Sequence, residues 1–340
     1  MINGHGDEYV GELEANFSSN VWYGADNSAL YKHLYSQMHT IERYPDTEVC
    51  SLKQPLSKKN KIATTQLLIC NGSTEAFYLI ANAFSGSTSL IVTPTFSEYA
   101  DACKMHKHMV QCTNYKNLTI DIETSKPNLV WICNPNNPDG YCLETDEIKQ
   151  LLLSYPKSIF VMDEAYIHFT QQKVCMVDEL QNHSNLIIIQ SLTKRYAIPG
   201  LRLGYIMTSE TLIAKVSLFR MPWSVNTLAI EAGKFILEND TNEFQLVSWL
   251  NECNLLKKSI DLLHCFDTIP SKTPYFLVKL KMGKASDLKT FLLNYKILVR
   301  QATNFEGLQG EYIRICTLSE EKNDLLINKL NEWSLSVIPS

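Results

Sequence analysis

The chain has 340 residues, of which 45% are hydrophobic and 20% are charged, and its formal net charge is −5. These values are typical of a soluble globular protein with two domains, or with one large domain and an elaboration. They exclude a nucleic-acid-binding protein, which needs a basic face, and no apolar run is long enough to span a membrane.

The first residues, MINGHGDEYVGELEANF, are acidic and polar and do not resemble a signal peptide. The ten cysteines have no regular metal-ligand spacing, and in a chain without an export signal they do not predict a disulfide framework. We therefore expect a cytoplasmic protein that holds no metal.

Seven short apolar runs follow one another in the first two thirds of the chain. They are rich in β-branched residues and do not alternate with polar ones, which is typical of strands buried on both faces of a largely parallel sheet. The runs are LLIC (67–70), LIVT (90–93), MVQC (109–112), LVWIC (129–133), IFVMD (159–163), LIIIQ (186–190) and GYIM (204–207). Helical patterns lie between several of them, at 73–84, 96–106 and 143–155.

The last third changes character. Long amphipathic stretches at 226–238 and 243–265 are followed by three strand candidates and a final helix; the strand candidates are YFLVKL (275–280), ILVR (297–300) and YIRIC (312–316). We expect a large α/β domain over 45–235, a smaller α+β domain over 236–340, and a segment over 1–44 that forms an arm or joins the smaller domain.

Polar residues follow several of the predicted strands, where an open α/β sheet binds its ligands. The turn Gly72-Ser73-Thr74 opens a helix and could bind a phosphate, although an ordinary capped turn has the same sequence. The loop NPNNPDG (134–140) is rigid and presents the amide of Asn137. Asp163 is a carboxylate at the end of a buried strand, which needs a cation or an N–H partner, and a helix cap would also supply one.

The stretch SLTKRYAIPGLRLGY (191–205) places Lys194 at the same edge of the sheet. A partly desolvated lysine near other cations has a lowered pKa and can form a Schiff base, whereas most lysines are solvated on the surface. Each of these strand ends has an ordinary explanation when taken alone, but the four together favour a single ligand site.

The groups define the ligand. Gly72, Ser73, Thr74, Ser191 and Arg202 suit a phosphate; Lys194 suits a carbonyl; Asp163 suits a protonated ring nitrogen; and Asn137 and Tyr166 suit a ring oxygen. Pyridoxal 5′-phosphate (PLP) has all four features, and a carboxylate at its ring nitrogen strengthens the ring as an electron sink.

With these residues the chain resembles the fold-type I PLP-dependent enzymes of the aminotransferase class I/II branch. SLTKRYAIPGLRLGY is similar to the branch's lysine signature, NPNNPDG to N-P-N-N-P-T-G, and DEAYIHF (163–169) to D-E-A-Y-x-x-F. The resemblance implies the aspartate aminotransferase fold, with a mostly parallel seven-stranded sheet in the large domain. Asp139 departs from the usual threonine of the asparagine loop.

The resemblance also implies roles for individual residues. Lys194 would carry the cofactor and move the proton, and Asp163 would pair with the ring nitrogen. Tyr99 matches the aromatic residue that stacks on the ring, and Arg314 matches the arginine that binds the substrate carboxylate. Tyr44, in RYPD, matches the tyrosine that reaches the phosphate from a neighbouring subunit, which implies a homodimer.

Within the branch, the sequence resembles two groups of enzymes. One is the threonine-phosphate decarboxylases, which make aminopropanol phosphate for cobalamin biosynthesis, and the other is the histidinol-phosphate aminotransferases of histidine biosynthesis. The stretches GHGD (4–7), NFSSNV (16–21) and ILVRQATNFEGLQGEYIRICT (297–317) resemble the decarboxylases more closely. Asp7 replaces a glycine of that pattern, and a proline after the Asn20 segment is missing.

We therefore expect a decarboxylase of L-threonine O-3-phosphate that acts through an external aldimine, with an aminotransferase as the alternative. His5, Asn20, Arg300 and Arg314 are expected to surround the phosphate and carboxylate of a small phosphorylated amino acid. A PLP-sensing module of a transcription regulator fits less well, because the chain has no spare length for a DNA-binding domain.

Overall fold

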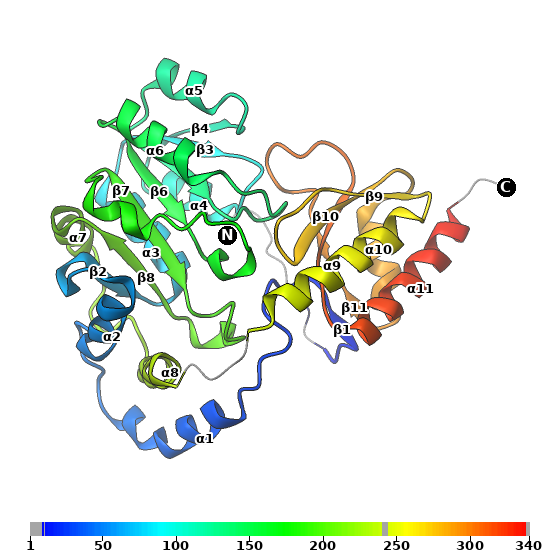
Figure 1. The fold of residues 1–340 in the computed structure, drawn as a ribbon, viewed down its shortest axis with the longest axis horizontal. Coiled ribbons are helices and arrows are strands. Elements are labelled where there is room, and N and C mark those ends of the chain that lie inside the picture. Colours follow the sequence, from blue (N-terminus) through cyan, green and yellow to red (C-terminus); the bar gives the residue numbers. More distant parts are fainter. Residues whose placement is uncertain (1–8, 10, 240–243, 338–340) are drawn as a thin grey trace.

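The computed structural model describes residues 9, 11–239 and 244–337, and two separate β-sheets dominate it (Figure 1). The larger sheet has seven strands and the smaller has four. The expected α/β architecture, with a mostly parallel seven-stranded sheet, is confirmed.

The large sheet is built from the seven predicted runs. Its strands are β2 (Leu67–Cys70), β3 (Thr88–Val92), β4 (Met109–Thr113), β5 (Leu129–Cys133), β6 (Ile159–Asp163), β7 (Leu186–Ser191) and β8 (Gly204–Thr208), in the order β2-β8-β7-β6-β5-β3-β4. Strand β8 runs antiparallel to β2 and β7, and the other pairs are parallel. The carboxyl ends of β5, β6 and β7 therefore meet at one edge.

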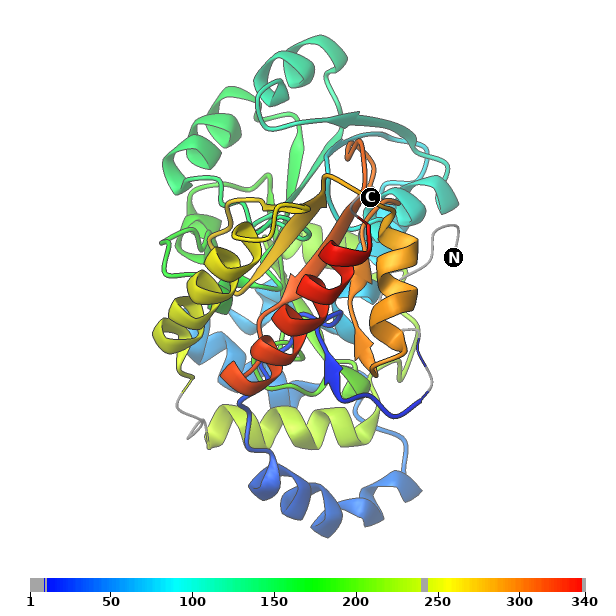
Figure 2. The same cartoon turned by 90° about the vertical axis from the view of Figure 1, so that its right-hand side faces the viewer.

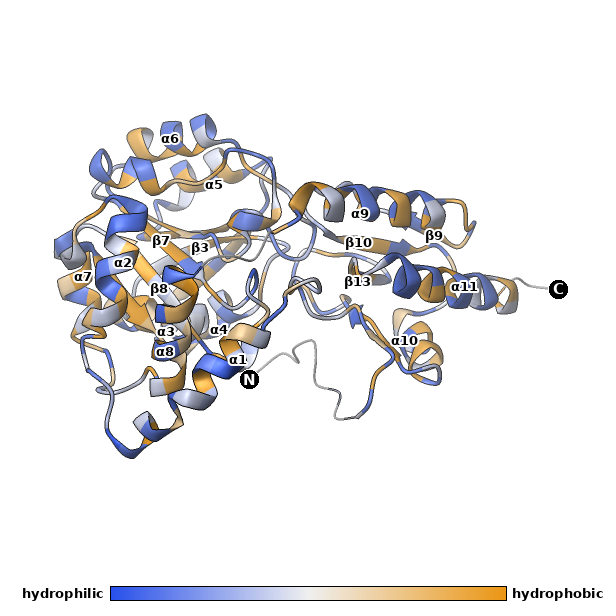
Figure 3. Cartoon of the chain, turned by 60° about the horizontal axis from the view of Figure 1, so that its bottom comes forward, coloured by the Kyte–Doolittle hydropathy of each residue, from blue (hydrophilic) through white to orange (hydrophobic). Residues whose placement is uncertain are grey.

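Helices cover both faces of this sheet, which is why its strands are apolar throughout. Helices α3 (Gly72–Ala83), α4 (Glu98–Met105) and α7 (Glu210–Ser217) share one apolar cluster with the sheet. Helices α2 (Cys50–Asn60), α5 (Leu118–Ser125), α6 (Thr145–Ser154) and α8 (Thr227–Glu238) share the cluster on the other face. Figure 3 shows β7 and β8 as strongly hydrophobic segments within this layered arrangement.

Truncation of one side chain in this core should cost much of the stability. Phe160 of β6 is fully buried, so Phe160→Ala should lower the free energy of unfolding by about 3–5 kcal/mol, because it removes apolar contacts and leaves a cavity. Leu153→Ala is the matched control, since Leu153 on α6 is 69% exposed, and its effect should stay within about 0.5 kcal/mol. Urea unfolding measures both variants, and equal midpoints would contradict the assigned core.

The small sheet contains β9 (Phe266–Thr268), β10 (Tyr275–Leu280), β12 (Arg300–Gln301) and β13 (Tyr312–Cys316), in the antiparallel order β12-β13-β10-β9. Helices α9 (Leu246–Asp261), α10 (Ala285–Leu293) and α11 (Glu320–Ser336) lie on its outer face (Figure 2). These elements enclose a separate apolar core. None of the helices in the described ranges is long and apolar enough to cross a bilayer.

The N-terminal segment contacts both parts of the molecule. Strand β1 (Ala15–Asn16) pairs in parallel with β11 (Ile297–Leu298), so the predicted strand 297–300 is in fact divided between β11 and β12. The Phe17 carbonyl accepts the N–H of Cys316 at 2.9 Å. We propose the division 1–44, 45–235 and 236–340, which the separate cores support.

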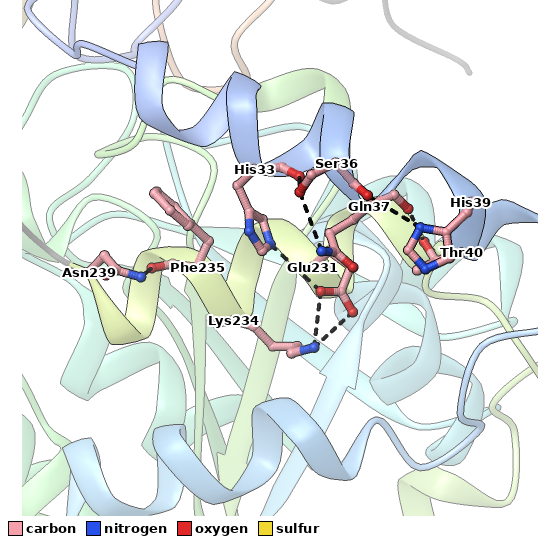
Figure 4. Close-up of polar contacts among 9 residues, drawn as sticks. All are labelled: His33, Ser36, Gln37, His39, Thr40, Glu231, Lys234, Phe235 and Asn239. Atoms are coloured by element: carbon pink, nitrogen blue, oxygen red, sulfur yellow. Dashed lines mark hydrogen bonds and ion pairs between the residues drawn. The ribbon is translucent and has the colours of Figure 1, made fainter.

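After β1 the chain forms helix α1 (Ser28–Ser36) and then the 3-10 helix η1 (Met38–Glu42). Both pack against α8 (Figure 4). The imidazole of His33 stacks on Phe235 with ring centroids 4.9 Å apart, and its Nε2 atom lies 3.7 Å from the Glu231 carboxylate. Lys234 contacts the same carboxylate at 2.9 Å. These contacts hold the segment that leads to Tyr44 against the large sheet's layer.

Candidate active site

A cavity of about 240 Å³ opens at the carboxyl ends of β5, β6 and β7 and is closed on its other side by the small sheet. Most of the predicted site residues form its walls. These are Asn20, Ser73, Thr74, Tyr99, Asn137, Asp163, Tyr166, Lys194, Arg202, Arg300 and Arg314. Residues far apart in the sequence thus meet where ligands bind in open α/β sheets.

Lys194 lies three residues beyond the end of β7, on a loop fixed by backbone hydrogen bonds. The N–H of Ile198 donates to the Thr193 carbonyl at 3.1 Å, and the N–H of Trp22 donates to the Lys194 carbonyl at 3.1 Å. The Lys194 Nζ atom lies 6.0 Å from the centroid of the Tyr166 ring. Burial raises the pKa of Asp163, and the charge of Lys194 opposes part of that rise; both residues line the cavity.

Asp163 is the last residue of β6 and is only 4% exposed. The Tyr99 hydroxyl donates to its Oδ2 atom at 2.5 Å, and the Ala165 N–H donates to Oδ1 at 2.9 Å. Burial raises the pKa of Asp163 from 3.8 to about 6, and these two hydrogen bonds and Lys194 oppose the rise. A desolvated carboxylate of this kind gains from a cationic partner such as a protonated ring nitrogen.

Tyr99 reaches Asp163 from helix α4, and its ring lies parallel to Trp131 with centroids 5.8 Å apart. The ring of Phe77 packs nearly perpendicular to the Tyr99 ring, with centroids 4.8 Å apart. Tyr99 is almost fully buried, so these rings fix the orientation of its hydroxyl towards the carboxylate. Its predicted stacking on the cofactor ring stays a prediction.

One end of the cavity combines a cation, backbone N–H groups and hydroxyls. A Cβ atom on Gly72 would lie 2.6 Å from Arg202 Nη2, and one on Gly204 would lie 2.6 Å from the backbone nitrogen of Ser73. The two glycines therefore let Arg202 and the N-terminus of α3 come together. Ser191 is the register partner of Gly204 in the β7–β8 pair, and its Oγ is 2.8 Å from Thr193 Oγ1. Such a set of groups suits a phosphate.

The opposite wall carries two arginines that face each other across a strand pair. Arg300 of β12 and Arg314 of β13 are register partners, so their side chains leave the same face of the small sheet. Arg314 donates to Asn137 Oδ1 at 2.6 Å and to the Ser18 carbonyl. Arg300 donates to Asn304 Oδ1 at 3.1 Å. Two neighbouring cations beside one cavity favour an anionic ligand.

Asn20 and Tyr166 lie between these two ends. Asn20 is 3% exposed, and its amide makes no hydrogen bond of ordinary geometry, although it lies close enough to lower the pKa of the Tyr166 hydroxyl. Burial is the larger influence, and the pKa of Tyr166 is raised overall. A buried amide without hydrogen bonds costs free energy, so a polar ligand group in the cavity would stabilise it.

Some predicted residues lie elsewhere. Gly72 and Ser191 do not line the cavity; Gly72 lies against Arg202, and Ser191 pairs with Gly204. Tyr44 is 82% exposed, lies against Trp223 at 4.9 Å and is not part of the wall. His5 lies outside the described residues.

The sequence did not indicate several wall residues, because ordinary serines, threonines and aromatics carry no distinctive signal. They are Ser18, Ser19, Phe77, Phe96, Ser97, Cys133, Ala165, Thr193, Pro199, Asn304 and Phe305. Several of them could have been found, since they belong to motifs already quoted: Ser18, Ser19, Ala165, Thr193, Pro199, Asn304 and Phe305.

The donor set fits PLP. The cradle made by Gly72 and Gly204 suits the phosphate, the Lys194 amine suits the aldehyde, and the buried Asp163 suits the ring nitrogen. Asn137 and Tyr166 lie in the same wall, where the ring hydroxyl would need them. The sheet order and this site define a PLP-dependent enzyme with the aspartate aminotransferase fold.

Comparisons with known proteins agree. The family model for aminotransferase class I and II matches residues 14–330, and the chain belongs to this family. It is 30% identical over 338 residues to threonine-phosphate decarboxylase of Salmonella typhimurium, covering 96% of this chain and 92% of that protein. It is 32% identical over 305 residues to histidinol-phosphate aminotransferase of Thermoanaerobacter sp. (strain X514), covering 87% and 85%.

A solved structure is also similar. The crystal structure of L-threonine-O-3-phosphate decarboxylase from Porphyromonas gingivalis superposes with a TM-score of 0.91 at 39% sequence identity, covering 94% of this chain and 99% of that one. The chain is therefore an enzyme of the PLP-dependent aminotransferase class, similar both to decarboxylases and to aminotransferases.

Proposed function

We propose that this protein decarboxylates L-threonine O-3-phosphate to aminopropanol phosphate, a step of cobalamin biosynthesis. The observation that carries the proposal is the opposed pair Arg300 and Arg314 at one cavity with the Lys194 amine. A small substrate with both a carboxylate and a phosphate has one anion for each arginine. The 39% identity to the solved decarboxylase supports the same reaction.

Each residue of the site has a separate role in the proposed reaction. Arg314 would bind the carboxylate, and Arg300 with Asn20 would bind the substrate phosphate; His5 is proposed to join them. The ring nitrogen would be kept protonated by Asp163. When bound, PLP supplies an electron sink that stabilises negative charge at the substrate Cα. With that charge stabilised, the substrate carboxyl group would leave as CO2, and Lys194 in its protonated ammonium form would supply the proton that replaces it at Cα.

Orientation selects the reaction. By holding the substrate's anionic groups, the arginines would decide which substituent of Cα is placed to react, and so whether CO2 is lost or Lys194 removes the Cα proton. Histidinol-phosphate aminotransferase is the second candidate, because a relative with that name is 32% identical and its reaction would use the same lysine. Both candidate reactions use an anionic small molecule as substrate.

One pair of assays separates the two reactions. We expect purified holoenzyme to release CO2 from O-phospho-L-threonine, and not to form glutamate from 2-oxoglutarate when histidinol phosphate is the amino donor. Glutamate formation without any CO2 release would overturn the proposed decarboxylation and favour the aminotransferase.

Removal of one arginine should weaken substrate binding more than it slows the chemistry. Arg300→Met should raise KM for O-phospho-L-threonine by about 10–100-fold, because a charge-assisted hydrogen bond contributes about 1.5–3 kcal/mol. Lys279→Met is the control, since Lys279 is an exposed cation of the same sheet, outside the cavity. Steady-state kinetics measures both variants, and an unchanged KM in Arg300→Met would remove this residue from the substrate site.

We further propose a cytoplasmic homodimer. Tyr44 and Trp223 are large aromatic side chains that are 82% and 48% exposed beside each other, which suits burial by a second copy of the chain. In that dimer, Tyr44 would reach the phosphate end of the neighbouring site. All ten cysteines are free thiols, as is usual in a reducing compartment.

A further inference from the structure

Behind the cofactor site lies a buried carboxylate that the proposed chemistry does not use. Glu164 follows Asp163 directly at the end of β6 and is fully buried. Successive residues of a strand point to opposite faces of the sheet. Asp163 therefore meets Tyr99 on the cofactor side, while Glu164 meets the backbone of Met176, a member of the apolar cluster on the other face.

The hydrogen bonds around Glu164 all point towards its carboxylate. The Met176 N–H donates to Oε1 at 2.7 Å, and the Gln190 Nε2 donates to Oε2 at 2.8 Å. The Cys175 thiol lies 3.4 Å from Oε2 as a third donor. The Tyr205 hydroxyl donates to Gln190 Oε1 at 2.6 Å, which orients the amide so that its NH2 faces the acid. Three donors and no acceptor suit an ionised carboxylate.

This network joins the strands that carry the cofactor residues. Gln190 immediately precedes Ser191 on β7 and is the register partner of Tyr205 on β8. The N–H of Glu164 also donates to the Ile189 carbonyl at 2.8 Å. The ends of β6, β7 and β8 are thus tied together by side chains just where Asp163 and Ser191 leave them.

Burial of the Glu164 charge is unfavourable. Desolvation, with a smaller contribution from the neighbouring Asp163, raises the pKa of Glu164 from 4.5 to about 7, although the hydrogen bonds from Met176, Gln190 and Cys175 lower it. A neutral glutamine of the same shape would avoid this cost. The titratable groups near Glu164 are the preceding Asp163 on the opposite face, Cys175 on the loop before the 3-10 helix Val177–Gln181, and, through Gln190, Tyr205 on β8.

We infer that Glu164 is a positioning residue of the cofactor site, which holds the ends of β6 and β7 together through Gln190 and places a second negative charge behind Asp163. The charge stabilises positive charge on the bound cofactor, and the hydrogen bonds keep the Asp163 carboxylate and the Ser191 hydroxyl in place. The inference concerns cofactor binding and holds for either candidate reaction.

Spectroscopic titration of the holoenzyme tests it without any substrate. The visible absorption band of lysine-bound PLP changes as that group loses its proton, and its pKa reports the local charge. Glu164→Gln should lower this pKa by about one unit, because a nearby negative charge favours the protonated form. Glu164→Asp retains the charge and should restore most of the shift. Cys112→Ala, on the edge strand β4 and outside this network, is the control and should titrate like the wild type.

A purely structural role gives a different result. In that case Glu164→Gln would change only the midpoint of urea unfolding and would leave the pKa of the band at its wild-type value, which overturns the inference. If Glu164→Gln does not fold, Gln190→Met tests the same network from its other side. Loss of the amide donor should keep Glu164 protonated to higher pH and lower the pKa of the band by a smaller amount, and an unchanged value again overturns the inference.

Discussion

Lys194→Ala should abolish both the catalytic activity and the yellow absorbance of the protein, with a fall in kcat of roughly 10⁴-fold or more. The amine lies in the cavity beside Tyr166, and it is close enough to Asp163 to oppose part of the rise that burial causes in the pKa of that carboxyl. No other lysine lines this cavity in the part of the chain that the structure describes, so none can replace it. Visible absorbance and a turnover assay measure the two losses.

Lys157→Ala is the control for this prediction, because Lys157 is an exposed lysine away from the cavity. It should keep both properties. The assignment would be contradicted if the visible band of the Lys194→Ala protein persisted at wild-type intensity after dialysis against excess PLP and removal of unbound cofactor.

Asp163→Asn should lower kcat by about 10²–10³-fold while leaving the fold intact, because it removes a preorganised charge from the ring nitrogen. Asparagine has nearly the same shape, and its Oδ1 can still accept the Ala165 N–H that Asp163 accepts at 2.9 Å. Single-turnover kinetics with saturating PLP separates this loss from weaker cofactor binding. Wild-type kcat in this variant would show that the charge has no catalytic role.

The same substitution should stabilise the protein once the cofactor is removed. The pKa of Asp163 rises from 3.8 to about 6 on folding, so the folded state binds the proton more tightly than the unfolded state does. The destabilising effect of the charge is therefore absent below pH 3.8, grows between the two values and is complete above pH 6. Above pH 6 it is about 3 kcal/mol.

Urea unfolding of the cofactor-free proteins at two pH values checks this prediction. Asp163→Asn should exceed the wild type in unfolding free energy at pH 8, and the difference should shrink towards pH 4. A variant that is less stable than the wild type at pH 8 would contradict the burial cost assigned to this carboxylate.

The large sheet was predictable because its strands are buried on both faces. Such strands are continuous apolar runs, and the predicted runs 67–70, 129–133 and 159–163 coincide with β2, β5 and β6. The strands of the small sheet were harder to predict from the sequence. Residues 297–300 form one apolar run but two strands, and the two-residue strand β1 has too few positions for any period.

The cofactor end of the site was predictable because most of its residues lie at or just after the end of a strand that is fixed by the sheet, as Asp163 and Lys194 do. The substrate end was not, because it depends on how the small sheet lies against the large one. The sequence indicated Arg300 and Arg314, but their direct opposition follows from the β12–β13 register, and the contact from Arg314 to Asn137 spans 177 positions. The network of Glu164 depends in the same way on contacts between strands.

The central claim is that Lys194 holds PLP in this cavity. Treatment of the holoenzyme with sodium borohydride fixes the cofactor to the amine that carries it, and peptide mass spectrometry then identifies the modified residue. We predict a single phosphopyridoxyl group on the peptide that contains Lys194. A label on any other lysine, or a stoichiometric cofactor that leaves Lys194 unmodified, would contradict the account.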